Sequence, residues 1–164
     1  MVSDFTRVFQ EKLYRELSRI SAYNTLKEKW QPDQGKRRLI CIDVIMRGKD
    51  RVVVIEIESH RQAPSNNIAK IFYWLEIEPP EKPITIVQLF SPFYQKHKLK
   101  RAVSEKLGRL IEKEYSSKLI YRAVDFEPRK EFKEFKQIYD KPGEYEQAVK
   151  ELAKRTSLKI KDLL

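Results

Sequence analysis

The chain has 164 residues, of which 41% are hydrophobic and 35% are charged, and its formal net charge is +10. This length and hydrophobic content predict a single folded domain over 1–164 and exclude a disordered chain. No apolar run has the length of a membrane span, the N-terminus lacks the apolar segment of a signal peptide, and the single cysteine, Cys41, cannot form an internal disulfide. We therefore expect a cytoplasmic protein with no membrane partner.

Hydrophobic periodicity predicts the elements in the first part of the chain. Apolar residues at helical spacing predict a helix over 4–21, and a loop or short strand follows over 24–35. Two β-rich runs, 37–46 and 51–59, are joined around Gly48, which indicates an antiparallel hairpin. The chain is thus expected to begin with a helix and a strand hairpin.

The rest of the chain alternates between helices and strands. The predicted elements are a helix over 64–77, a strand over 84–91, a basic helix over 94–115, a strand over 118–126, and helices over 129–139 and 144–155. Helices between strands predict crossover connections, so we expect an α/β fold whose mixed sheet contains the hairpin and carries helices on both faces. The core should span about 4–126, with a helical extension over about 128–164.

Two of the predicted helices have apolar faces that we expect to be buried. The helix over 64–77 buries Ile68, Ile71, Phe72 and Leu75, and the basic helix buries Leu99, Val103, Leu107, Leu110 and Ile111. Tyr73 and Trp74 lie off the first stripe. Their rings are expected either to form a homodimer interface or to be covered by the C-terminal helices.

Three carboxylates lie on two otherwise apolar strands. Glu56 and Glu58 are two residues apart and share a face, and Asp43 lies on the preceding strand. A two-residue turn at Gly48-Lys49 makes Asp43 the diagonal neighbour of Glu56, whereas a four-residue loop places the two directly opposite each other; an odd loop separates them. We expect Asp43, Glu56 and the Ile57 carbonyl to bind Mg²⁺ or Mn²⁺, while Glu58 orients or deprotonates the attacking water.

Two other titratable residues are candidates for the same site. Glu16 borders the apolar stripe of the first helix, where it either contributes an acid or pairs with Lys12 along the helix. His60 follows the second strand of the hairpin. It either assists the water or contacts the scissile phosphate, or else it is simply solvated.

Positive charge is concentrated in short segments of the chain. The candidate nucleic-acid contacts are Lys36, Arg37 and Arg38 before the hairpin, Arg61 and Gln62 after it, and Lys96, Lys98, Lys100 and Arg101 near the start of the basic helix. Each run alone is typical of a solvated surface. Two basic runs together with a carboxylate cluster favour nucleic acid, and DNA is the expected partner.

The stretch "IDVIMRGKDRVVVIEIE", residues 42–58, resembles the core motif of the PD-(D/E)xK nuclease superfamily, in which an Asp, a hairpin and an acid-x-Lys follow one another. The order of elements over about 4–90 is also similar to that superfamily, which includes restriction endonucleases and archaeal Holliday junction resolvases. Asp43 matches the first acid and Glu56 the second. Glu58 stands where a lysine is expected, as in some restriction enzymes of that fold.

The resemblance implies a restriction endonuclease-like fold and a metal-dependent endonuclease that acts on duplex or branched DNA and leaves a 5′-phosphate, in many members as a homodimer. One alternative is a catalytically inactive DNA-binding protein that retains the fold. Another is a structural protein whose acids merely terminate a strand. Mg²⁺-dependent cleavage that is lost in Asp43→Ala and Glu56→Ala would distinguish the endonuclease from both alternatives. Salt-sensitive binding without cleavage would favour the inactive DNA-binding protein.

Overall fold

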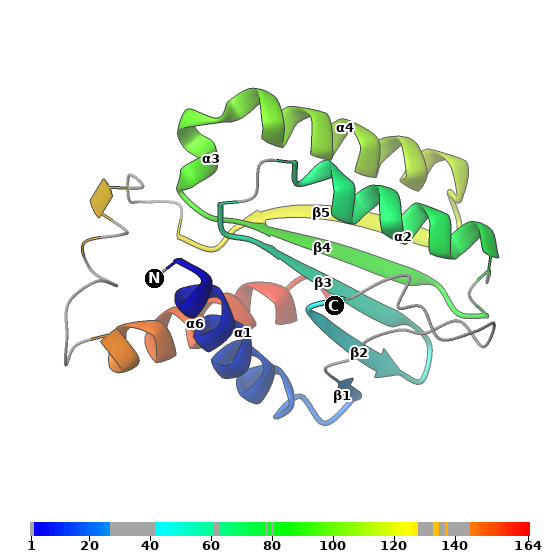
Figure 1. Ribbon diagram of the computed structural model, residues 1–164. Helices are drawn as coiled ribbons and strands as arrows, with labels where there is room; N and C mark the ends of the chain where they lie inside the picture. Colours follow the sequence, from blue (N-terminus) through cyan, green and yellow to red (C-terminus); the bar gives the residue numbers. More distant parts are fainter. Residues whose placement is uncertain are drawn as a thin grey trace, which may run out of the picture.

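The fold is a five-stranded mixed sheet with helices on both faces, as the sequence predicted (Figure 1). The computed structural model describes residues 2–26, 42–60, 63–77, 79, 81–127, 133–134, 137 and 145–164. The elements are α1 (Val2–Leu17), β1 (Tyr23–Leu26), β2 (Val44–Gly48), β3 (Val52–Glu58), α2 (Ser65–Ile77), β4 (Ile84–Phe90), α3 (Phe93–Lys96), α4 (Lys98–Glu114), β5 (Leu119–Asp125) and α6 (Tyr145–Lys161).

The strands lie in the order β1-β2-β3-β4-β5. β1, β2 and β3 are antiparallel, whereas β3, β4 and β5 are parallel. The parallel strands are connected through α2 and through α3 and α4, and Figure 1 shows α2 and α4 on one face of the sheet with α1 and α6 on the other. The carboxyl ends of β3, β4 and β5 therefore share one edge, the usual place for ligand sites in parallel sheets.

The sheet separates two apolar cores. Strands β3 and β4 are buried along their whole length, as expected for strands covered on both faces. On one face α1 presents Phe5, Phe9, Leu13 and Leu17, spaced four residues apart. α6, from the segment expected to form a C-terminal helical extension, completes this core with Val149, Leu152, Ala153 and Ile160.

The buried face of α2 differs from the predicted stripe at two aromatic residues. Trp74 is only 7% exposed and packs into the core under α2 and α4, whereas Phe72 is 37% exposed. The inward face includes Ile68, Ile71, Trp74 and Leu75. Steps of three or four residues, such as these, keep side chains on one face of a helix. Of the two rings expected either at an interface or under the C-terminal helices, that of Tyr73 is exposed and that of Trp74 is buried in the cluster of α2 and α4.

α4 buries small residues in place of its leucines. Leu99, Val103 and Leu110, predicted to be buried, are exposed, and Leu99 is 79% exposed. The inward residues are Ser104, Gly108 and Ile111. A Cβ atom at Gly108 would overlap the buried ring of Tyr121 on β5, so at this position the helix lies too close to the sheet for a larger side chain.

Several predictions on local structure fall partly or wholly beyond the described residues. The first strand of the hairpin, predicted over 37–46, is described from residue 42 onward, and the predicted helix over 129–139 lies mostly outside the described residues. The predicted loop or short strand over 24–35 begins as strand β1. Within the described part of the chain, no helix combines the length and apolar character needed to cross a bilayer.

Candidate active site

The hairpin has the second of the two converging registers predicted from the sequence. The Gly48 N–H donates to the Arg51 carbonyl at 2.9 Å, and Val44 is the partner of Ile55. This is the pairing that a four-residue loop from Gly48 to Arg51 gives, and its last printed pair, Val44 with Ile55, immediately precedes Glu56 on β3.

Asp43 lies at a bend where β2 begins. Ile42 packs on the α2 side of the sheet and Val44 on the α1 side, although residues two apart in a regular strand share a face. The Asp43 Oδ2 atom accepts the Ile57 N–H at 2.7 Å, a bond that a regular β2 backbone would otherwise make. The Asp43 carbonyl accepts the side-chain N–H of Gln10 on α1 at 2.7 Å. These two bonds fix the carboxylate of Asp43 beside the Glu56–Ile57 peptide.

The Ile57 carbonyl points to the same edge of β3 as Asp43. The Glu58 carbonyl accepts the Ser91 N–H at 3.0 Å and so faces β4. Successive backbone groups alternate in direction along a strand, so the carbonyl of Ile57 faces the opposite edge, where β2 begins. The Ile57 carbonyl and the Asp43 carboxylate therefore lie at the same edge of β3.

Glu58 occupies a different environment from the one predicted for it. Its side chain is fully buried, and Oε1 accepts hydrogen bonds from the amides of Asn67 and Gln88, both at 2.8 Å. Glu56 is also buried and is the register partner of Gln88 on β4. A fully buried Glu58 does not contact solvent, so the structure does not show it placed to deprotonate a solvent water.

Gln88 is the centre of a buried polar network that sequence reasoning missed. Its Oε1 accepts the hydroxyls of Ser104 and Tyr121, both at 2.8 Å. Its Nε2 donates to Glu58 and to the Pro64 carbonyl, the latter at 3.1 Å. Two donors on one side and two acceptors on the other permit only one orientation of the amide. The signal in the sequence was a glutamine in the middle of "ITIVQLF", a strand buried on both faces.

Burial raises the pKa of the Tyr121 hydroxyl above its ordinary value, with a further contribution from the charge of Glu105. The hydroxyl is therefore protonated at neutral pH and donates to Gln88. The network thus has a fixed direction, from the hydroxyls of α4 and β5 through Gln88 to Glu58.

The three predicted acids do not form a single cluster. Within the described residues, no group of three or more His, Cys, Asp or Glu side chains is placed to hold a metal ion. The reason is that Asp43 turns toward the Ile57 amide, while Glu58 is held by two amides of the buried network. Asp43, Glu56 and the Ile57 carbonyl remain, and two carboxylates with a carbonyl are the donor types that suit Mg²⁺.

His60 is exposed and anchored at the end of β3. Its Nδ1 shares a hydrogen bond of 2.9 Å with the Ser59 hydroxyl, which shares another of 2.7 Å with Thr6 on α1. The Ser91 hydroxyl donates to the Ser59 carbonyl. These contacts connect α1 and the ends of β3 and β4, and they fix one nitrogen of the imidazole next to the candidate site.

Glu16 is not part of the site. Its two carboxylate oxygens pair with Arg19 at 2.8 and 2.9 Å, in place of the predicted pairing with Lys12. The α1 residues that reach the site are Thr6 and Gln10. Glu16 lies six residues beyond Gln10, which corresponds to roughly 9 Å along the helix axis.

The predicted nucleic-acid contacts have different outcomes. Lys36, Arg37, Arg38, Arg61 and Gln62 lie outside the described residues. Lys96 and Lys98 are exposed near the carboxyl ends of β4 and β5, and the Lys100 amine lies 5.9 Å from the centre of the Phe93 ring.

Arg101 forms an internal connection between α4 and β5. Its guanidinium bonds Asp125 at 2.5 Å and Glu105 at 2.6 Å and lies over the Phe90 ring. Burial lowers its pKa, but the hydrogen bonds to Asp125 and Glu105 outweigh that effect and raise it. Two carboxylates already bind this cation within the protein.

The fold and site together define an α/β protein whose sheet carries a carboxylate pair at the strand ends, above a buried amide network. This arrangement is consistent with a restriction endonuclease-like fold. Comparison of the sequence with protein-family models and with curated proteins finds no match. The chemistry of the site is therefore the basis for a functional assignment.

Proposed function

We propose that this protein is a metal-dependent endonuclease that hydrolyses phosphodiester bonds in DNA. The observation that carries the proposal is the position of the Asp43 carboxylate, which accepts the N–H of Ile57, the residue directly after Glu56 on the adjacent strand. Carboxylates that lie close together repel each other, and a divalent cation bound by both would relieve that repulsion. The alternative is a catalytically inactive DNA-binding protein of the same fold.

Asp43, Glu56 and the Ile57 carbonyl are the residues that would hold Mg²⁺ or Mn²⁺. When bound, such an ion polarises a phosphoryl oxygen and lowers the pKa of a bound water. The protein's own contribution is orientation, because Gln10 and the Ile57 amide fix Asp43 from two directions.

His60 is the residue we assign to proton transfer, since Glu58 is fully buried and His60 is exposed. Histidine is suited to accept a proton near neutral pH, and Ser59 holds its Nδ1. Glu58 is then a buried carboxylate two residues from Glu56, and hydrogen bonds from Asn67 and Gln88 hold its side chain in place.

DNA is the proposed substrate because the net charge is +10 and exposed lysines lie at the same sheet edge as the site. Lys96 and Lys98 follow β4, whose carboxyl end is beside that of β3. Cations at this edge would attract a phosphate backbone and position it across the strand ends.

Purified protein is expected to cleave DNA with Mg²⁺ or Mn²⁺ and to lose that activity with a chelator. The assay uses supercoiled plasmid, single-stranded DNA, a four-way junction and duplex RNA, each with Mg²⁺, Mn²⁺, Ca²⁺ or EDTA. The substrate that is cleaved shows whether the enzyme prefers duplex or branched DNA, a choice that the geometry of the site does not determine. Binding that weakens steeply with salt but never leads to cleavage under any ion contradicts the endonuclease and favours the inactive DNA-binding protein.

The proposal includes a homodimer, because cutting both strands of a duplex or junction calls for two active sites. Apolar side chains are exposed on α2 and α4, which lie side by side on one face of the sheet: Phe72, Tyr73, Ile77, Leu99, Val103 and Leu110. Light scattering is expected to give twice the chain mass, and Tyr73→Lys with Val103→Lys to give monomers. A monomeric mass for the unmodified protein contradicts this part of the proposal.

A further inference from the structure

The residue between α3 and α4 is His97, and its ring is held against a second aromatic ring. The His97 imidazole stacks on the ring of Phe93, four residues earlier, with centroids 4.0 Å apart and 28° between the ring planes. The His97 carbonyl accepts the Lys100 N–H at 3.1 Å, which fixes the backbone where α4 begins. Backbone and ring are both held, so the imidazole is oriented before any ligand binds.

Both rings of this stack keep part of their surface in contact with solvent. His97 and Phe93 are half-buried, whereas the neighbouring Tyr94 is fully buried. Within the part of the chain that the structure describes, no side chain hydrogen-bonds the His97 imidazole, and its contact is the stack on Phe93. A partly exposed ring that another ring supports is the kind of surface on which an unpaired base stacks.

Lysines precede and follow His97 and lie beside its stacked partner. Lys96 and Lys98 are exposed, and the Lys100 amine lies 5.9 Å from the centre of the Phe93 ring. The segment 93–100, "FYQKHKLK", contains these three lysines and no acidic residue. Its charge therefore favours the approach of a phosphate backbone.

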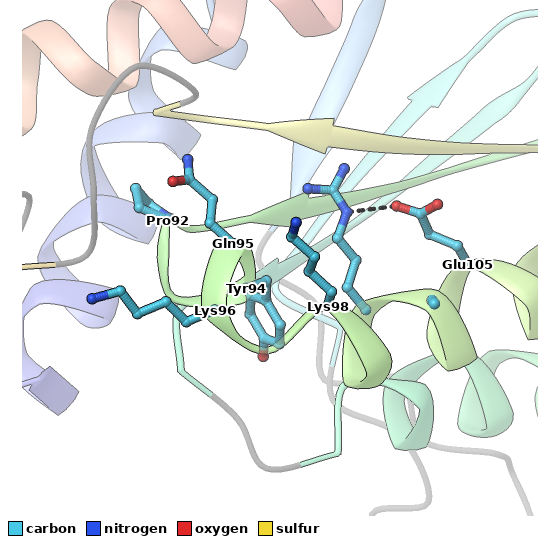
Figure 2. A pocket seen from close by; sticks show the side chains of 8 residues that line it. Pro92, Tyr94, Gln95, Lys96, Lys98 and Glu105 are labelled. Carbon is cyan, nitrogen blue, oxygen red and sulfur yellow. Dashed lines mark hydrogen bonds and ion pairs between the residues drawn. The ribbon is translucent and has the colours of Figure 1, made fainter.

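An open pocket of about 690 Å³ next to His97 has room for a phosphate (Figure 2). Gln95, Lys96 and Lys98 line it, so lysines on both sides of His97 contribute to one pocket. In Figure 2 the side chains of Gln95 and Lys98 extend in the same direction, whereas Lys96 extends away from them. Arg101 also lines the pocket but already pairs with Glu105. Lys98 is therefore the lining cation that we assign to phosphate binding.

The stack is connected to the strand ends at which the candidate active site lies. Ser91, directly after β4, donates its N–H to the Glu58 carbonyl and its hydroxyl to the Ser59 carbonyl. The same hydroxyl oxygen accepts the Phe93 N–H at 3.2 Å. A DNA strand that crosses the carboxyl ends of β3 and β4 would therefore reach the stack.

We infer that the α3–α4 junction binds an unpaired segment of a DNA strand, with one base stacked on His97 and a neighbouring phosphate at Lys98. The inference rests on the nucleic-acid ligand of the proposed function but not on catalysis. It adds a contact that a fully paired duplex does not make, because the bases of a duplex are stacked on one another.

Binding is measured by fluorescence anisotropy with EDTA present, so a protein that fails to cleave DNA leaves the result intact. The probes are a single-stranded octanucleotide, an abasic octamer of the same charge and a blunt duplex. The preference for the octanucleotide over the abasic octamer measures base stacking, and the salt dependence measures phosphate contacts.

His97→Ala is expected to weaken octanucleotide binding by about tenfold, in the range of one lost base contact. Binding of the abasic octamer and of the duplex should not change. His97→Tyr supplies another ring at the same position and is expected to recover most of the lost affinity. Circular dichroism and light scattering verify that both variants keep the fold and the mass of the unmodified protein.

Lys98→Ala is expected to reduce the slope of log affinity against log salt by about 0.7 for both octamers, the value for one phosphate contact on a single strand. The control is Lys150→Ala, which removes an exposed lysine on α6, at the opposite face of the sheet (Figure 1). This control should leave the slope unchanged.

Equal loss of affinity for the octanucleotide and the abasic octamer in His97→Ala would show that the imidazole only packs α3 against α4, and would overturn the inference. So would the absence of recovery in His97→Tyr, or the same slope in Lys98→Ala and Lys150→Ala. Cleavage of DNA by a protein that binds both octamers equally would overturn the stacking contact and leave the proposed endonuclease intact.

Discussion

Asp43→Asn and Glu56→Gln are each expected to lower Mg²⁺-dependent cleavage of DNA by about 10³-fold while leaving the protein folded. A bound metal ion contributes several kcal/mol of transition-state stabilisation, and about 1.4 kcal/mol corresponds to a tenfold change in rate. Asparagine at 43 keeps an oxygen that can accept the Ile57 N–H, so the substitution removes charge and not the bond that fixes the bend. Glutamine at 56 likewise preserves size in a buried position.

Matched controls exist for both substitutions. Asp50→Asn changes an exposed acid in the turn of the same hairpin, and Glu146→Gln changes an exposed acid on α6. Both controls are expected to cleave at the unmodified rate, and circular dichroism with thermal unfolding verifies the fold of all four variants. Unchanged cleavage in Asp43→Asn or Glu56→Gln would show that these acids only terminate their strands.

Gln88→Leu is expected to reduce the free energy of unfolding by about 3–5 kcal/mol. The substitution removes four hydrogen bonds at once and leaves the hydroxyls of Ser104 and Tyr121 and the carboxylate of Glu58 each short of a partner in a buried region. Each polar group left without its partner costs about 1–3 kcal/mol, and more when it is charged. Urea unfolding monitored by fluorescence measures the change.

The matched control for this substitution is Gln147→Leu, at an exposed position on α6 whose amide bonds only the exposed Glu151 among the hydrogen bonds described for it. Its expected effect is within about 0.5 kcal/mol. A similarly small effect of Gln88→Leu would show that the network contributes little to stability.

The variant Gln88→Glu gives the same network a pH dependence. Two buried carboxylates at positions 58 and 88 would share a proton, so the pKa of the pair is higher in the folded than in the unfolded protein. The sign follows from linkage: stability is full below the unfolded pKa and is lost as pH rises through the folded one. The variant should therefore recover stability relative to the unmodified protein as the pH is lowered from 8 toward about 4, and a pH-independent difference would contradict the shared proton.

The sequence was sufficient to predict the strands of the sheet and the β2–β3 hairpin. Runs such as "RVVVIEIE" and "ITIVQLF" are β-branched and apolar throughout, so strands buried on both faces were the expected result. The register of the hairpin was also within reach, because side chains alternate along a strand and only an even loop is compatible with convergence of the acids.

The positions of exposed and buried helix residues were not predictable in the same way. The leucines of α4 have helical spacing, yet Ser104 and Gly108 face the sheet, because Tyr121 and Gln88 occupy the space under that helix. Trp74 was buried for the related reason that α2 lies against α4 and the sheet. A periodic pattern defines a face only to within one residue or so of rotation, and neighbouring elements select the orientation.

The sequence by itself determined that Glu56 and Glu58 lie on one strand, that Asp43 lies beside the neighbouring strand, and that the two strands form a hairpin. Only the tertiary structure decided what each acid contacts. Asp43 turns to the Ile57 amide because β2 begins at the following residue, and Glu58 is enclosed because Asn67 and Gln88 approach it from α2 and β4. Strand membership depends on local side-chain alternation, whereas the partners of a buried carboxylate come from segments distant in sequence, which no local pattern records.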